Sequence, residues 1–257
     1  MSLESYLRDL RDSGRKVLAP YLTCGFPSPE AFPDMLRGVV DAGADLLEIG
    51  IPFSDPIMDG PIVQRASDVA LKAEVRPGSV LRTLEGLEVG IPFVFMTYVN
   101  PILAMGEEKF ASEAVACGAS GVIIPDLPVE EAGSWLRAAR KYELQTAFLT
   151  APTTPKDRIE AIVREGSGFV YCVSLLGVTG VRDTLSERAK GVVDALRAVS
   201  DRPALVGLGV STPEQAAEAC GFSDGVIVGS AVLKAAQEDG VEAAIGLVKD
   251  MRGAIDG

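Results

Sequence analysis

Short apolar runs alternate with amphipathic stretches along the chain. Runs rich in Val, Ile, Leu and Phe are typical of strands buried on both faces, and we expect strands near Val17–Leu22, Leu46–Ile51, Phe93–Tyr98, Gly121–Pro125, Thr146–Leu149, Phe169–Val173, Ala204–Leu208 and Gly225–Val228. Amphipathic spacing predicts helices between them, among others at Pro29–Ala42, Glu107–Cys117, Val129–Tyr142, Lys156–Arg164, Ala189–Val199 and Pro213–Cys220. Hydroxyl residues directly before Pro29 and Pro213 are expected to cap two of these helices.

Eight strand–helix units in 257 residues indicate an α/β fold, a (β/α)8 TIM barrel forming one domain over residues 1–257. The polar start, Met1–Leu10, predicts an additional N-terminal helix. Two small domains would also fit the length. A doubly wound open sheet is the structural alternative, but no GxGxxG follows the first strand.

The composition excludes several functions. A net charge of −12 argues against binding to nucleic acid or to an anionic membrane, and no apolar run is long enough to span a bilayer. No signal-peptide core is evident, so we expect a cytoplasmic protein. The chain has no histidine, which removes His-based triads and His-ligated metals. Its four scattered cysteines are expected to be reduced thiols or small apolar residues.

In a parallel barrel the reactive groups gather where strands end. Glu48 lies within the second apolar run, where burying an ionised carboxylate is costly. It is either a catalytic acid or base with a raised pKa, or one half of a buried ion pair, for which Arg37 and Arg65 are the nearest cations in sequence. Asp59 follows the same strand and is either catalytic or a helix-cap or turn residue.

Two further acids are expected to serve the backbone. Asp55 and Asp126 stand at turns, in Asp55-Pro56 and Asp126-Leu127-Pro128. Asp is a common residue at the start of turns, so we favour a structural role for both.

Glycine-bearing loops follow strands six, seven and eight, and this arrangement indicates a phosphate site. Gly209, Gly229 and Ser230 lie at the last two strand ends, and a short helix is expected to begin at Ser230 and run to about Lys234. Backbone N–H groups at such a helix start bind anions. The segment Gly177–Gly180 could add donors from the sixth loop. Alternatively, these glycines only form tight turns.

The chain resembles the alpha subunit of tryptophan synthase along essentially its whole length. The motif from Leu46 to Pro61, LLEIGIPFSDPIMDGP, and the loop-six motif Gly177–Gly180 are the most specific parts of this resemblance. The segments Pro20–Gly25 and Ile124–Pro128 resemble the ends of strands one and four. Departures occur at Met58 and Ile62, where many members have Ala and Thr, and at Leu175-Leu176, where small or polar residues are frequent.

The resemblance implies a lyase that cleaves indole-3-glycerol phosphate to indole and glyceraldehyde 3-phosphate in L-tryptophan biosynthesis. It implies that Glu48 protonates C3 of the indole ring and accepts the proton of the glycerol hydroxyl. It implies that Asp59 hydrogen-bonds the indole N–H and stabilises the positive intermediate. The other implied contacts are Tyr21, Ile124, Tyr171 and Thr179 for the substrate, and Gly180, Gly209, Gly229 and Ser230 for its phosphate.

The resemblance also implies a partner, a beta subunit that receives the indole in an αββα heterotetramer. Pyridoxal phosphate is expected on that partner, and no cofactor or metal in this chain. Two segments, 53–59 and 100–106, lie where the family meets the beta subunit. Two other functions remain open: a different phosphate-binding barrel enzyme, such as an isomerase or indole-3-glycerol phosphate synthase, and a binding partner without turnover of its own. Isomerases place acids after strands one and five, where this chain has Thr23-Cys24 and Thr150–Pro152.

Overall fold

The computed structural model describes residues 1–173, 185–207 and 209–257. Within these residues, eight parallel strands close into a barrel in which each strand pairs with the next in sequence and the last pairs with the first. The strands are β1 (Val17–Thr23), β2 (Leu47–Gly50), β3 (Phe93–Met96), β4 (Gly121–Ile123), β5 (Gln145–Thr150), β6 (Val170–Val173), β7 (Ala204–Gly207) and β8 (Gly225–Val228). The predicted TIM barrel is confirmed.

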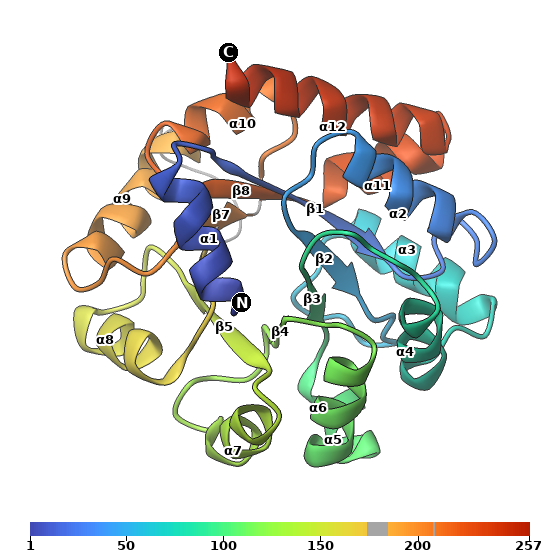
Figure 1. Cartoon of the computed structure of the whole chain (residues 1–257), viewed down its shortest axis with the longest axis horizontal. Coiled ribbons are helices and arrows are strands. Elements are labelled where there is room, and N and C mark those ends of the chain that lie inside the picture. Colours follow the sequence, from blue (N-terminus) through green and yellow to red (C-terminus); the bar gives the residue numbers. More distant parts are fainter. Residues whose placement is uncertain (174–184, 208) are drawn as a thin grey trace.

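Helices surround the barrel (Figure 1). Those of the described residues are α1 (Leu3–Asp12), α2 (Phe32–Asp41), α3 (Pro61–Lys72), α4 (Pro77–Glu85), α5 (Val99–Met105), α6 (Glu107–Ala116), α7 (Gly133–Lys141), α8 (Lys156–Glu165), α9 (Leu185–Arg197), α10 (Pro213–Cys220), α11 (Ser230–Glu238) and α12 (Val241–Asp256). The strands lie between this helical layer and the packed interior, which explains their continuous apolar character. On the helical side, the indole N–H of Trp135 in α7 donates to the Thr146 hydroxyl of β5 at 3.1 Å.

Local sequence decides several helix boundaries. Thr212 caps α10 as predicted, with its side chain accepting from the Gln215 N–H. The predicted helix start at Pro29 is wrong, because α2 begins at Phe32. Ser28 closes a turn over residues 29–31 by accepting from the Ala31 N–H. A second proline, Pro33, then fits only in the first turn of a helix, since it has no N–H to donate.

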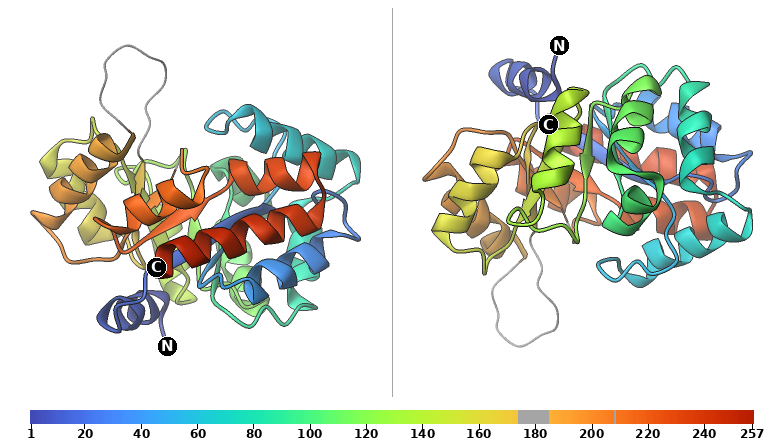
Figure 2. Two further views of the ribbon diagram at one scale, coloured as in Figure 1. Left: turned by 90° about the horizontal axis from the view of Figure 1, so that it is seen from above. Right: turned by 90° about the horizontal axis from the view of Figure 1, so that it is seen from below.

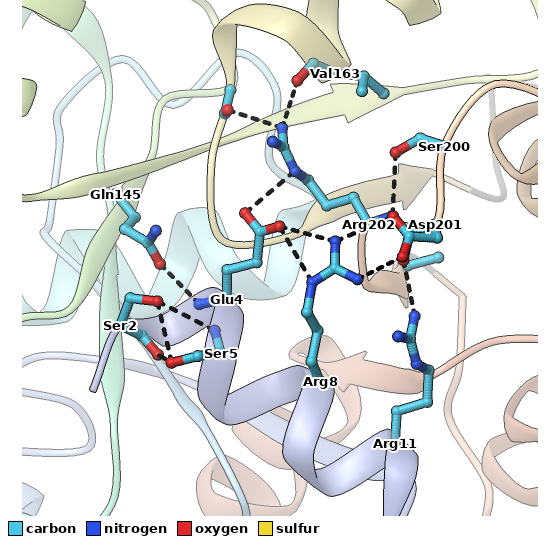
Figure 3. Close-up of polar contacts among 12 residues, drawn as sticks. Ser2, Glu4, Ser5, Arg8, Arg11, Gln145, Val163, Ser200, Asp201 and Arg202 are labelled. Atoms are coloured by element: carbon cyan, nitrogen blue, oxygen red, sulfur yellow. Dashed lines mark hydrogen bonds and ion pairs between the residues drawn. The ribbon is translucent and has the colours of Figure 1, made fainter.

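Helix α1 closes the amino end of the barrel, and Figure 2 shows it at one end of the molecule. A Cβ on Gly121, at the start of β4, would lie 3.4 Å from the Leu3 side chain. Polar contacts secure the same helix (Figure 3): Arg8 pairs with Asp201 at 2.6 Å, and Glu4 pairs with Arg202 at 3.4 Å. The predicted N-terminal helix is therefore present and packs as a cover over the strand starts.

Buried charge at this amino end is paired. Asp45, which directly precedes the second strand run, is 4% exposed. Its carboxylate accepts from Arg15 at 2.5 Å, from Arg252 of α12 at 3.0 Å and from the Leu18 N–H of β1 at 3.0 Å. Asp224, just before β8, repeats the pattern with Arg197 and with the Ala204 N–H of β7.

Among the described residues, no helix is both long and apolar enough to span a bilayer. The four cysteines are free and buried, as expected from their spacing.

Candidate active site

Two tyrosines line the interior near the carboxyl ends of the strands, and glycines on the neighbouring strands make room for them. Tyr21 of β1 is in register with Glu48 of β2. A Cβ on Gly50 would lie 2.1 Å from the Tyr21 hydroxyl oxygen, and a Cβ on Gly207 would lie 2.1 Å from that of Tyr171. These positions therefore require glycine, because any larger residue would displace a tyrosine.

Glu48 is buried beside these rings, with 4% of its surface exposed. Its Oε2 atom has no hydrogen-bond partner among the described residues. Burial, reinforced by the charge of Asp59, raises the pKa of Glu48 to about 8. The ion-pair alternative finds no support in the described part of the chain, where Arg37 pairs with Asp34 and no ion pair includes Glu48. A carboxyl group in this state holds a proton at neutral pH and can donate it.

Asp59 reaches the same region from the loop between β2 and α3. Helix α3 is capped by Gly60 and not by Asp59, so the cap interpretation is wrong. The turn interpretation stays open, because the Asp59 N–H donates to the Pro56 carbonyl at 3.0 Å. The Asp59 side chain instead hydrogen-bonds with Tyr98, which lowers its pKa, while burial has the larger and opposite effect and raises it to about 6. The Gln64 side chain donates to the Asp59 carbonyl at 2.8 Å and helps to fix the backbone there. At neutral pH, Asp59 is therefore mostly ionised beside a mostly protonated Glu48.

The other two acids serve the backbone. Asp55 is exposed, and its carboxylate accepts from the Ser54 hydroxyl at 2.6 Å within the turn. Asp126 accepts from the Val99 N–H at 2.9 Å and so satisfies the first N–H of α5. Both arrangements agree with the predicted structural roles.

The phosphate-type residues at strands seven and eight lie at the same end as the tyrosines. Gly229 caps α11, and Ser230 is its first residue, so the predicted helix is present and runs on to Glu238. The Leu233 N–H is bonded to the Gly229 carbonyl, which leaves the preceding N–H groups without an acceptor inside the helix. A Cβ on Gly229 would lie 3.3 Å from Cβ of Tyr21, which places this helix start next to the tyrosine. Gly209 has a φ of +99°, which favours glycine.

Three predicted contacts stay untested, because no described contact joins them to the two acids or because they lie outside the described residues. Ile124, at the end of β4, is buried and lines a hollow of about 170 Å³ together with Phe148 and Ile162. The described contacts do not join it to Glu48 or Asp59. Thr179 and Gly180 lie outside the described residues.

Sequence reasoning did not single out Tyr98, whose hydroxyl contacts Asp59. The available signal was its position directly after β3, where strand-end residues meet the site. No group of three or more His, Cys, Asp or Glu side chains with metal-binding spacing occurs in the part of the chain that the structure describes.

A closed parallel barrel with two interacting carboxylates at the carboxyl ends of its strands belongs to the class of (β/α)8-barrel enzymes. Within this class, the family model "Tryptophan synthase alpha chain" matches residues 7–252. The chain belongs to the tryptophan synthase alpha chain family, as its sequence motifs predicted. It is accordingly a carbon–carbon lyase that cleaves indole-3-glycerol phosphate to indole and glyceraldehyde 3-phosphate.

Individual relatives agree along nearly the full length. The chain is 44% identical to the tryptophan synthase alpha chain of Streptomyces coelicolor over 262 residues, covering 98% of this chain and 97% of the relative. It is 45% identical to that of Streptomyces avermitilis, covering 90% and 84%. Among solved structures, tryptophan synthase subunit alpha of Legionella pneumophila superposes with a TM-score of 0.90 at 36% identity, covering 100% and 99%. A ligand-free tryptophan synthase structure of M. tuberculosis gives a TM-score of 0.91 at 37% identity, covering 99% of each chain.

Proposed function

We propose that Glu48 and Asp59 are the catalytic pair of this lyase, with Glu48 as the acid and base and Asp59 as the electrostatic stabiliser. The observation that carries the proposal is the buried Glu48, whose Oε2 has no partner among the described residues and whose pKa is raised to about 8. A structural acid at such a depth would need a cation or donors to offset its desolvation. Its protonated state at neutral pH suits a group that must deliver a proton.

The proposed reaction uses the Glu48 carboxyl group twice, once to donate a proton and once to accept a different one. Glu48 first donates it to C3 of the indole ring, and the positive charge that develops on the ring is stabilised by the ionised Asp59, which accepts the indole N–H. The Glu48 carboxylate then takes the proton of the glycerol hydroxyl on the carbon next to the ring. The bond between that carbon and C3 breaks, its electron pair returns to the ring, and indole and glyceraldehyde 3-phosphate are released with Glu48 protonated again.

The remaining predicted residues bind the substrate in this proposal. Tyr21 and Ile124 flank the indole ring, Tyr171 lines the site near Asp59, and Thr179 is a further contact. N–H groups at Gly209, Gly229 and Ser230, together with Gly180, hold the phosphate at the start of α11. The contact of Gly229 with Tyr21 supports this division of the site, because it brings the phosphate end next to the ring-binding end.

Indole release from indole-3-glycerol phosphate by the purified chain tests the proposal. Glu48→Gln should lose measurable turnover while still binding glycerol phosphate, because its phosphate contacts are intact. Glu131→Gln is the matched control, since Glu131 is exposed on the loop before α7. Turnover of Glu48→Gln close to that of the wild type would exclude Glu48 as the proton donor.

We further infer that the chain docks onto a tryptophan synthase beta subunit in an αββα assembly, with pyridoxal phosphate bound by that partner and none in this chain. Large exposed apolar side chains support this inference. Ile57 and Met58 in the loop after β2 are 78% and 52% exposed, and Leu103 of α5 is 55% exposed. All three lie in the two segments predicted to meet the partner, and exposed apolar residues on a folded surface mark interaction sites.

A binding assay with a purified beta subunit tests this surface. Ile57→Asp and Leu103→Asp should each weaken the affinity at least tenfold. Val115→Asp on α6 should leave it unchanged, because Val115 is exposed but lies outside both segments. Equal effects of all three substitutions would contradict the assignment of this surface. We also propose a cytoplasmic location, since the substrate and the beta subunit are expected there.

A further inference from the structure

Tyr98 joins the Asp59 loop to the barrel scaffold through three contacts. Its side chain is 2% exposed and follows β3 directly, as the N-cap residue of α5. Its hydroxyl oxygen accepts from the Met58 N–H at 3.0 Å, and the same hydroxyl interacts with the Asp59 carboxylate, to which it can donate. Its ring stacks on Phe53, with 5.2 Å between ring centroids and 30° between planes. One side chain therefore contacts the loop at both ends, on either side of the exposed Ile57.

The backbone of Tyr98 is held on both sides, by β4 and by the segment that follows β4. The Thr97 N–H donates to the Ile123 carbonyl at 3.1 Å. The Val99 N–H donates to the Asp126 carboxylate at 2.9 Å. Tyr98 is therefore part of the fixed scaffold, and the loop packs against it. A side chain fixed in this way can set the orientation of a neighbouring functional group, here the Asp59 carboxylate.

Titratable groups from four strands face Asp59. They are Tyr21 from β1, Glu48 from β2, Tyr98 after β3 and Tyr171 from β6, and Asp126 faces Tyr98 in turn. No lysine or arginine is paired with Asp59 among the described residues. The Tyr98 hydroxyl is thus the described donor that favours the ionised carboxylate, and a hydrogen bond to the charged form stabilises that form.

We propose that Tyr98 is a positioning residue that keeps Asp59 ionised and directed into the active site during the lyase reaction. The proposal rests on the role of Asp59 given above. Tyr98 itself need not touch the substrate, because it acts through the Asp59 carboxylate and the Met58 backbone. Asp126 contributes to the position of Tyr98 because its carboxylate accepts from the N–H of the next residue, Val99. Asp126 would then support the active site in addition to its turn.

Tyr98→Phe tests the proposal, because it removes the hydroxyl and keeps the ring against Phe53. Loss of the donor should move the acid limb of the kcat/KM profile up by about one pH unit. The ratio of wild-type to variant kcat/KM should then approach tenfold below pH 6 and fall towards its minimum above pH 8. Tyr142→Phe, a tyrosine at the end of α7, is the matched control and should leave the profile unchanged. A loss of activity in Tyr98→Phe that is the same at every pH would overturn the proposal.

A second measurement separates this proposal from the catalytic one. In a protein carrying ¹³C-labelled aspartate carboxyl groups, the Asp59 signal is assigned by its absence from Asp59→Asn. Its titration midpoint should rise in Tyr98→Phe and stay in place in Tyr142→Phe. The expected rise of the Asp59 midpoint does not depend on whether Asp59 matters for turnover. An unshifted midpoint would therefore contradict the proposed role of Tyr98 without contradicting the catalytic role of Asp59.

Discussion

The two ends of the barrel handle a buried carboxylate in opposite ways. Asp45 and Glu48 are three residues apart and each is 4% exposed. Asp45, at the amino end, accepts from two arginines and a backbone N–H. Glu48, in β2, has an oxygen without a partner among the described residues, and its strongest electrostatic neighbour is another acid. At the amino end, the charge of Asp45 is paired and stabilises the fold. At the carboxyl end, Glu48 lacks such partners and is available for proton transfer.

The largest expected effect breaks the carboxyl end. Glu48→Gln keeps the shape of the side chain and removes its ionisable carboxyl proton. We expect at least a 10³-fold loss of kcat in the indole-release assay, because one group supplies both proton transfers. The unfolding free energy should not fall at pH 7 and should rise, since the wild-type chain must take up a proton on Glu48 when it folds and the neutral amide need not. If Glu48→Gln instead lost much stability and little activity, Glu48 would be a structural acid like Asp45, and the contrast between the two ends would be wrong.

The next effect breaks the amino end. Asp45→Asn should lower the unfolding free energy by about 3–5 kcal/mol, because Arg252 and Arg15 lose their shared carboxylate. Urea denaturation measures this, and Asp194→Asn is the control, since its pair with Lys190 is exposed and contributes about 0.5 kcal/mol or less. The folded Asp45→Asn protein should keep its kcat within about twofold. A stability loss no larger than that of the control would show that the amino-end pair is dispensable.

The pH dependence of stability sharpens the comparison. The folded state holds the Glu48 proton up to a pKa of about 8, whereas the unfolded chain releases it near the ordinary value of 4.5. Between these pH values the folded state binds more protons, so the contribution of Glu48 to stability falls as pH rises. Wild type should therefore lose on the order of 3 kcal/mol relative to Glu48→Gln between pH 5 and pH 8.5. Parallel stability curves for the two proteins would show that Glu48 titrates normally.

The smallest of these effects concerns Asp59. Asp59→Asn should lower kcat about 10²-fold, because the amide keeps a hydrogen-bond acceptor and loses the negative charge. Asp55→Asn in the same loop is the matched control and should change kcat less than twofold, since Asp55 is exposed and serves its turn. A variant within about threefold of wild type, or under about 0.7 kcal/mol, would reduce Asp59 to a loop residue.

The sequence predicted most of the barrel because its strands are continuous apolar runs, and it identified Glu48 because an acid in such a run is unexpected. It could not decide between catalysis and an ion pair, since that depends on where cations such as Arg37 lie in space. The start of α2 was placed too early because two prolines compete for one helix start. Tyr98 was missed because its contact with Asp59 joins loops from two different strands, 39 residues apart. The pairing of Asp45 likewise depends on α12, over 200 residues away.

The central claim is that Glu48 is protonated at neutral pH. Infrared difference spectra of wild type against Glu48→Gln, recorded from pH 6 to pH 9.5, observe the carbonyl stretch of a protonated carboxylic acid directly. The account predicts a band that is present in wild type at pH 7, absent from the variant, and lost with a midpoint near pH 8. A wild-type spectrum without that band at pH 7, showing an ionised carboxylate in its place, would contradict it.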